Sequence, residues 1–272
     1  MLADNKKNII LTGVPRSGTS LLTKLISKQP NTLCFSEPSW IKEIRFEGQT
    51  AKQFTQALSL KLNTIREDIR KGNPIELTVK KGTTQLPDNY YLRDKEGMTN
   101  LKQTISVFIE HSDDLLICVK ANTIFTATLN KLICDESWDI FAVIRDPLYV
   151  LMSWRSLNIP VSKGKIKIGE LYSEYLRQAV LEKDLLVRQV KILDWFYKTY
   201  YQHNCQTIPY ELLVDEPAKI LSKITKTFCI SQTLSSSNSS HRYDSNEKST
   251  IINALKSYCF FVQKYYNEYL DS

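Results

Sequence analysis

One segment near the start of the chain combines glycines and hydroxyl side chains in a spacing that suits phosphate binding. Residues 13–20 (GVPRSGTS) separate two glycines by four residues, as in the G-x-x-x-x-G-K-[ST] phosphate loop. Backbone N–H groups in such a turn, together with the positive end of the following helix, attract a phosphate. Thr19 replaces the lysine of that pattern, and Arg16 is the cation inside the loop. Because nucleotide hydrolases use that lysine on the β- and γ-phosphates, the replacement disfavours ordinary ATP or GTP hydrolysis.

A second candidate anion site follows an apolar segment in the middle of the chain. Residues 139–144 (DIFAVI) predict a buried strand, and Pro147 suits the first turn of a helix after it. Arg145 leaves the end of the strand, and Ser153 lies eight residues later, two turns into the helix. An arginine and a hydroxyl so placed are able to clamp a second phosphate. Taken alone, the segment is equally consistent with an Arg145–Asp146 salt bridge and a solvent-facing serine.

The two motifs together resemble the donor-binding motifs of sulfotransferases that use 3′-phosphoadenosine 5′-phosphosulfate (PAPS). The matching segments are PRSGTSLL at 15–22 and IRDPLYVLMS at 144–153. A third segment, IPYELLVDEP at 208–217, is similar to the family's YEdLv..P stretch. The PRSGT form resembles the tyrosylprotein, glycan and bacterial branches more than the cytosolic aryl and steroid branch, which has lysine in place of Arg16. The resemblance runs from residue 8 to about 230 and implies a P-loop-like sulfotransferase architecture.

The resemblance also implies roles for individual residues. The first loop would hold the 5′-phosphosulfate of the donor through Pro15, Arg16, Ser17, Gly18, Thr19 and Ser20. Arg145 and Ser153 would hold the 3′-phosphate, and Tyr210 would lie near the adenosine. Leu21 stands where the cytosolic branch has an adenine-stacking tryptophan, and the glycine-rich phosphate motif near the C-terminus is missing. Arg242 is the candidate to take the place of that motif.

Sulfuryl transfer requires a general base for the acceptor hydroxyl and cations for the leaving phosphate. Glu37 is the candidate base, because it follows the second predicted strand. Its offset of 21 residues from Arg16 resembles that of the catalytic glutamate in the tyrosylprotein and related bacterial branches. An exposed or helix-capping carboxylate is the alternative. His111 is the fallback base, because a histidine has this role in the aryl and steroid branch. Lys120, at the end of the third predicted strand, is the third candidate catalytic residue beside Glu37 and Arg16. The alternative for Lys120 is a solvated surface lysine.

The elements that must position these residues alternate along the chain. Short apolar runs predict strands at 8–12, 32–35, 115–119, 139–144 and 206–209. Helical patterns are found at 19–28, 51–71, 122–133, 147–157, 169–202, 217–228 and 246–270. The alternation predicts an α/β fold with a parallel central sheet and helices on both faces. We expect a single domain over residues 1–272, in which 38–110 and 155–205 are acceptor-side insertions.

Composition restricts the class of protein and of ligand. The 272 residues are 42% hydrophobic and 24% charged, which excludes wholesale disorder, collagen and coiled coil. A net charge of +7 suits an anionic ligand, and no polybasic run or aromatic–basic motif indicates nucleic acid. The six cysteines form no CxxC pair and the three histidines lack zinc spacing, so we expect reduced thiols and no metal site. We also expect no signal peptide and no membrane span.

These observations lead to one expectation and two alternatives. We expect a cytoplasmic, metal-independent enzyme that transfers a sulfuryl group in line from PAPS to a hydroxyl, amine or carbamoyl nitrogen of a small molecule, and releases PAP. A bacterial natural product or a glycolipid precursor is the expected acceptor class, so the enzyme would act in natural product tailoring. A P-loop nucleotide kinase or hydrolase and a non-catalytic nucleotide-binding module are the alternatives.

Overall fold

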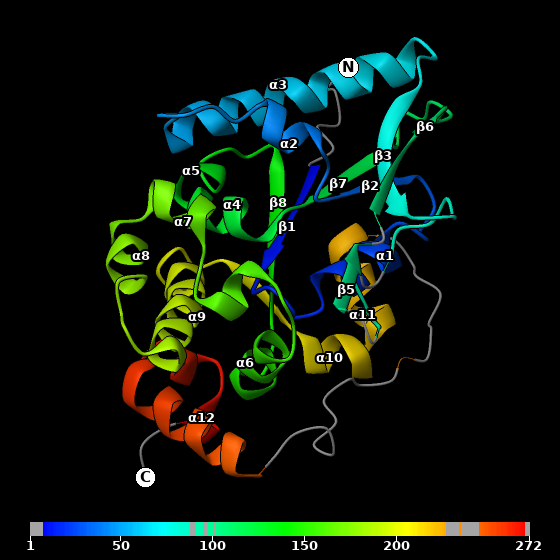
Figure 1. Ribbon diagram of the computed structural model, residues 1–272. Helices are drawn as coiled ribbons and strands as arrows, with labels where there is room; N and C mark the ends of the chain where they lie inside the picture. Colours follow the sequence, from blue (N-terminus) through cyan, green and yellow to red (C-terminus); the bar gives the residue numbers. More distant parts are fainter. Residues whose placement is uncertain are drawn as a thin grey trace.

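A five-stranded parallel sheet lies at the centre of the protein (Figure 1). The computed structural model describes residues 8–87, 91–94, 97–100, 102–226, 234 and 245–269. The strands lie side by side in the order β2-β7-β1-β8-β9. Their bounds are β1 (Asn8–Gly13), β2 (Thr32–Ser36), β7 (Leu116–Lys120), β8 (Trp138–Ile144) and β9 (Gln206–Pro209). Every pairing is parallel, as predicted, so the carboxyl ends of all five strands lie at one edge of the sheet.

Helices cover both faces of this sheet, which confirms the predicted α/β class. They are α1 (Thr19–Ile26), α2 (Trp40–Glu43), α3 (Ala51–Arg70), α4 (Asn122–Ala127), α5 (Leu129–Leu132), α6 (Pro147–Arg155), α7 (Lys167–Tyr172), α8 (Glu174–Ala179), α9 (Leu185–Gln202), α10 (Tyr210–Asp215), α11 (Pro217–Thr225) and α12 (Ser245–Tyr258). Short 3-10 helices occupy Pro160–Lys163, Val262–Lys264 and Asn267–Tyr269.

Successive side chains of β1 enter two separate apolar clusters, because strand side chains alternate between faces. Ile10 belongs to the larger cluster, which takes in apolar residues of α3, α4, α6, α9 and α12. Ile9 and Leu11 belong to the smaller one, built with α1, α10 and α11. Burial on both faces explains why β1 is a continuous apolar run rather than an alternating one.

Helix α3 crosses the amino ends of the strands, far from α6 and α12 (Figure 1). Its first turn has a capping box, in which Thr50 and Gln53 bond reciprocally. Arg66 of α3 donates hydrogen bonds to the Asn8 side chain (2.6 Å) and to the Leu115 carbonyl (3.0 Å), at the amino ends of β1 and β7. The amino edge of the sheet is therefore covered by α3, while the carboxyl edge carries the loops of interest.

Two antiparallel pairs of strands arise from a polar tract in which the sequence pattern predicts no strand. They are β3 (Ile75–Lys80) with β6 (Lys102–Val107), and β4 (Tyr91–Asp94) with β5 (Gly97–Asn100). In the first pair Lys80 lies opposite Lys102. Strand β6 (KQTISV) has only two apolar residues, Ile105 and Val107, which is too weak an apolar signal to identify it as a strand.

The helical tract predicted at 169–202 is in fact three helices, so the prediction of a continuous helix is wrong. Ser173 has an extended backbone and its side chain accepts a hydrogen bond from the Leu176 N–H, which starts α8. Asp184 caps α9 in the same way through the Val187 N–H. Capping side chains compete with helix continuation, and that competition overrides the apolar periodicity.

Candidate active site at the carboxyl edge of the sheet

The loop between β1 and α1 is fixed to strand β8. The Val14 N–H and the Ser17 hydroxyl both donate to the Val143 carbonyl, at 3.1 and 2.8 Å, and Trp154 of α6 donates to the Pro15 carbonyl at 2.8 Å. Gly18 ends the loop with φ of 96°, and no side chain caps α1. The first-turn N–H groups of α1 therefore face the loop without a side-chain acceptor, which is the arrangement that binds anions.

The two predicted phosphate motifs meet in the structure, although they are more than 120 residues apart. Arg16 Nε donates to Ser153 Oγ at 3.3 Å, and Arg145 Nη1 donates to the Arg16 carbonyl at 3.1 Å. Arg145 and Ser153 are 7% and 8% exposed, and Tyr197 donates its hydroxyl hydrogen to the Arg145 carbonyl. Two guanidinium groups and a serine hydroxyl therefore converge at one end of the phosphate loop.

Tyr210, at the start of α10, supports this cluster by packing. Its ring lies 4.5 Å from the Arg145 guanidinium carbon, a cation–π contact. On the loop side, a Cβ added to Gly18 would lie 2.5 Å from Tyr210 Cδ2, so only glycine fits there. Because Tyr210 is 4% exposed, its ring offers little area to a ligand. Its contact with adenosine stays a prediction.

Glu37 and Lys120 form an ion pair at the ends of β2 and β7. Lys120 Nζ lies 2.7 Å from Glu37 Oε1, and the Glu37 N–H donates to the Lys120 carbonyl at 2.7 Å. Lys102, from β6, approaches the other carboxylate oxygen at 2.8 Å. Exposed fractions are 3% for the Lys120 side chain, 24% for Lys102 and 38% for Glu37. The carboxylate is thus held by two ammonium groups, one on each oxygen.

These contacts set the protonation of the pair. The positive charge of Lys120, and after it that of Lys102, holds the pKa of Glu37 well below its ordinary value in spite of burial. Burial lowers the pKa of Lys120, Glu37 opposes that effect, and the charges of Lys102 and Arg16 add to it. Lys120 is paired with Leu11 of β1, two residues before Gly13, so the Glu37–Lys120 pair lies beside the phosphate loop and the charge of Arg16 acts on Lys120.

Arg16 and Glu37 both have left-handed backbones, with φ of 75° and 49°. For residues other than glycine this conformation costs roughly 1–2 kcal/mol and concentrates at functional sites. Two of the three residues predicted to be catalytic have this conformation, and Asn31, Asn204 and Lys226 share it outside the site.

The remaining candidate residues lie in the first turn of α1, at the opposite edge of the sheet or outside the described residues. Thr19 is buried and Ser20 half-buried in the first turn of α1. His111 is exposed, and its Nε2 lies 3.9 Å from Asp113 Oδ1. It precedes the amino end of β7, whereas Glu37 and Lys120 lie at the carboxyl end. The two ends of this five-residue strand are about 13 Å apart. The fallback assignment of His111 as the base is therefore wrong. Arg242 lies outside the described residues. Lys102 was not predicted, because no strand pattern identifies the tract around it.

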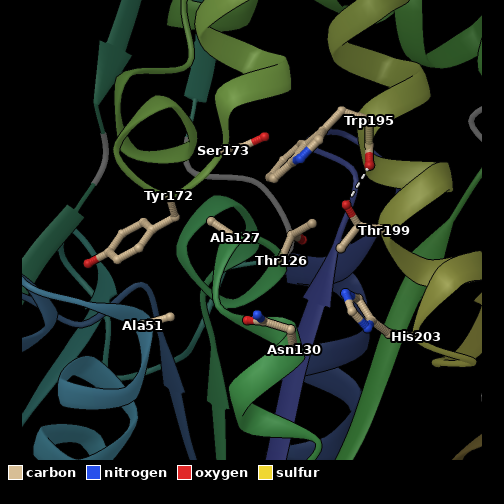
Figure 2. Close-up of a pocket in the computed structure, with 9 residues that line it drawn as sticks. All are labelled: Ala51, Thr126, Ala127, Asn130, Tyr172, Ser173, Trp195, Thr199 and His203. Carbon is tan, nitrogen blue, oxygen red and sulfur yellow. Dashed lines mark hydrogen bonds between the residues drawn. The ribbon is translucent and has the colours of Figure 1, made fainter.

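A cavity of about 290 Å³ has a different lining, which Figure 2 shows. Its walls come from α3, α4, α5, α7 and α9, from the residue between α7 and α8 and from the residue after α9. They are formed by Ala51, Thr126, Ala127, Asn130, Tyr172, Ser173, Trp195, Thr199 and His203. None of the residues predicted to bind donor or to be catalytic is among them. Thr126 connects the cavity wall to β1, because its hydroxyl bonds with those of Thr12 and Tyr200, both at 2.8 Å. The segments 38–110 and 155–205 both contribute to this cavity, and their acceptor-side role stays a prediction.

The described residues contain no cluster of three or more His, Cys, Asp or Glu side chains placed to share a metal ion. In the same part of the chain, no helix combines the length and apolarity that crossing a membrane requires.

Comparison with known proteins gives structural but not sequence matches. No protein-family model matches the chain, and no curated protein is significantly similar to it. A sulfotransferase from Alicyclobacillus acidocaldarius is 10% identical with a TM-score of 0.44, over 95% of this chain and 94% of that chain. The sulfotransferase domain from the curacin biosynthetic pathway is 13% identical with a TM-score of 0.41, over 81% and 72% respectively. A likeness at this level of identity and TM-score is weak and does not by itself indicate a function.

Proposed function

We propose that this chain is a sulfotransferase that moves a sulfuryl group from PAPS to a hydroxyl, amine or carbamoyl nitrogen of a small molecule. The observation that carries the proposal is the convergence of the two phosphate motifs, through Arg16, Ser153 and Arg145, next to the Glu37–Lys120 pair. A nucleotide with phosphate groups at both its 3′ and 5′ positions matches two adjacent anion sites. The same residues lie in the segments 15–22 and 144–153 that resemble sulfotransferase donor-binding motifs, and this resemblance supports the proposal.

The donor would be held by the phosphate loop and by the arginine and serine side chains beside it. The N–H groups of residues 17–20 and the Arg16 side chain would receive the 5′-phosphosulfate. Arg145 and Ser153 would receive the 3′-phosphate. Binding would then replace the Arg16–Ser153 hydrogen bond, so that the half-buried Arg16 guanidinium would exchange a neutral hydroxyl for an anionic partner.

The transfer itself would use the carboxylate and the cations beside it. Glu37 would take the proton of the acceptor hydroxyl while the acceptor oxygen forms a bond to sulfur. The bond between sulfur and the 5′-phosphate oxygen would break at the same time, so that PAP leaves and a sulfate ester is formed. Lys120 and Arg16 would stabilise the negative charge that grows on the leaving phosphate. Most of the rate acceleration would then come from positioning and electrostatics, with the base adding a further factor.

The acceptor class rests on chemistry rather than on the cavity. Hydroxyl-bearing small molecules, such as a bacterial natural product or a glycolipid precursor, remain the proposed acceptors, and water is the simplest surrogate for them in an assay.

Calorimetric titration tests the proposal directly. We expect PAP to bind at micromolar concentration with or without Mg²⁺, and ATP to bind at least tenfold more weakly. Ser153→Ala, which removes one predicted ligand of the 3′-phosphate, serves as the matched variant. A preference for Mg-ATP would refute the proposal in favour of a P-loop kinase. Absence of binding to both nucleotides would refute it as well, since a donor site would then be lacking.

A further inference from the structure

Lys102 reaches the Glu37 carboxylate from outside the central sheet. It begins β6, in the two-stranded β3–β6 sheet, whereas Glu37 and Lys120 follow β2 and β7 of the central sheet. The Lys102–Glu37 distance of 2.8 Å nearly equals the Lys120–Glu37 distance of 2.7 Å, and each ammonium occupies a different oxygen. A residue of the 38–110 segment therefore completes a triad with two predicted catalytic residues.

The triad contains more positive than negative charge. One carboxylate meets two ammonium groups, and Arg16 lies near enough to lower the pKa of Lys120. Lys120 is 3% exposed, so its ammonium has lost nearly all its hydration and needs an anionic partner at all times. Before donor binds, Glu37 supplies that partner. A 5′-phosphate bound by the adjacent loop would be a second anion able to do so.

Resting on the function proposed above, we infer that Lys102 is a positioning residue that keeps Glu37 in place when the 5′-phosphate of the donor takes Lys120 as its partner. Lys102 suits this task because it is 24% exposed and has a flexible four-carbon side chain, so it can follow the carboxylate. Lys120 would leave Oε1 and Lys102 would remain on Oε2. The exchange involves ion pairs only, and no covalent bond forms or breaks in it.

The exchange has a consequence for the base. With two lysines, Glu37 is ionised but weakly basic, since both charges lower its pKa. With Lys102 alone it stays ionised and oriented yet becomes more basic. Donor binding thereby makes Glu37 a stronger base, and its basicity is lowest when no donor is present.

Proton uptake during PAP binding tests this inference without an acceptor. Calorimetry at pH 4.5, close to the ordinary pKa of a glutamate, in two buffers of different ionisation enthalpy, gives the number of protons taken up. Each variant is compared with the same protein carrying Glu37→Gln, which cancels the titration of the PAP phosphates. In the wild type, the difference in proton uptake between the proteins with and without Glu37 should be near zero, because Lys102 keeps the pKa of Glu37 low in the complex. In Lys102→Met the difference should rise to about half a proton or more, because Glu37 then faces the phosphate without a cation and its pKa exceeds the ordinary value of ~4.3.

Two further variants control for charge and for structure. Lys102→Arg should behave as the wild type, because a guanidinium can hold the same oxygen. Lys80→Met removes an exposed lysine directly opposite Lys102 in the β3–β6 register and should also behave as the wild type. A zero difference in Lys102→Met would mean that Lys120 stays on Glu37, which overturns the inference. Equal uptake in Lys80→Met would reduce the effect to net charge and would overturn it too.

The outcomes separate this inference from the proposed function. If the wild type binds no PAP at millimolar concentration, the proposed function fails and the inference fails with it. If PAP binds but the uptake pattern is absent, the inference alone fails. A crystal structure of the wild type with PAP gives a second answer that needs no variant. Lys120 Nζ on the 5′-phosphate with Lys102 Nζ still on Glu37 supports the exchange, and Lys120 still paired with Glu37 refutes it.

Discussion

Replacing Gly18 by alanine gives the sharpest test of the loop geometry. Gly18 has φ of 96°, which costs an alanine roughly 1–2 kcal/mol. The new Cβ would also lie 2.5 Å from Tyr210 Cδ2, about 1 Å inside ordinary van der Waals contact. The ring cannot move freely, because it is buried and stacked on Arg145. Overpacking of this kind costs about 1–3 kcal/mol, so the total loss of unfolding free energy should be about 2–5 kcal/mol.

Gly48→Ala is the matched control for that variant. Gly48 has φ of 74°, but an added Cβ meets nothing within 4 Å. It should therefore show the backbone cost without the clash. At about 2 °C per kcal/mol for a chain of this size, Gly18→Ala should melt roughly 2–6 °C below Gly48→Ala.

The same clash should weaken donor binding. Tyr210 can relieve the overlap only by shifting about 1 Å, which displaces the Arg145 guanidinium now 4.5 Å from its ring. A displacement of that size commonly costs about tenfold or more in binding or rate. We expect the PAP dissociation constant to rise at least tenfold in Gly18→Ala and to stay within twofold in Gly48→Ala, measured by calorimetry. If the two variants melt together and bind PAP alike, the packing of Tyr210 between the loop and Arg145 is not what positions the site.

Three further predictions concern Glu37, Arg145 and Ser153. Glu37→Gln should lower turnover of PAPS by roughly 10²–10⁴-fold, the scale of a general base, without weakening PAP; unchanged turnover would remove Glu37 from the mechanism. Arg145→Ala and Ser153→Ala should weaken PAP far more than adenosine 5′-phosphosulfate, which lacks the 3′-phosphate, and equal losses in calorimetry would reject that assignment. Because the pKa of Glu37 is lowered in the folded protein, its ion pairs should stabilise the fold above pH ~4.3 and lose that effect as pH falls below it. The melting-temperature difference between wild type and Glu37→Gln should accordingly shrink from pH 7 to pH 3, and a constant difference would contradict the shift.

The parts of the fold that the sequence predicts are those with strong local signals. Strands β1, β2, β7 and β8 of the central sheet place residues in both apolar clusters, so their apolar runs are visible without an alignment, whereas the edge strand β9 is short and partly exposed. The glycine spacing of the loop and the helix-starting Pro147 are similarly local. The break of the 169–202 tract at Ser173 and Asp184 was missed because apolar periodicity outweighed two capping side chains that also occur inside helices.

The candidate site was predictable where it lies at strand ends. Glu37, Lys120 and Arg145 each follow a predicted strand, and parallel strands bring such residues to one edge. His111 was misjudged because it precedes its strand and so belongs to the opposite edge. Lys102 shows the remaining limit. Its contact with Glu37 spans 65 residues and joins two different sheets, and no local pattern encodes such a pairing.

The strand order also sets when the protein can acquire its site during synthesis. β1 lies between β7 and β8, and its first residue, Asn8, is paired with Trp138, 130 residues later. Ribosomes add about 5–20 residues per second, so an apolar β1 waits roughly 6 to 26 s for its second neighbour. The phosphate loop waits equally long, because its anchor is the Val143 carbonyl of β8. A nascent chain halted before residue 143 would therefore carry every residue of the loop and still lack the loop's shape.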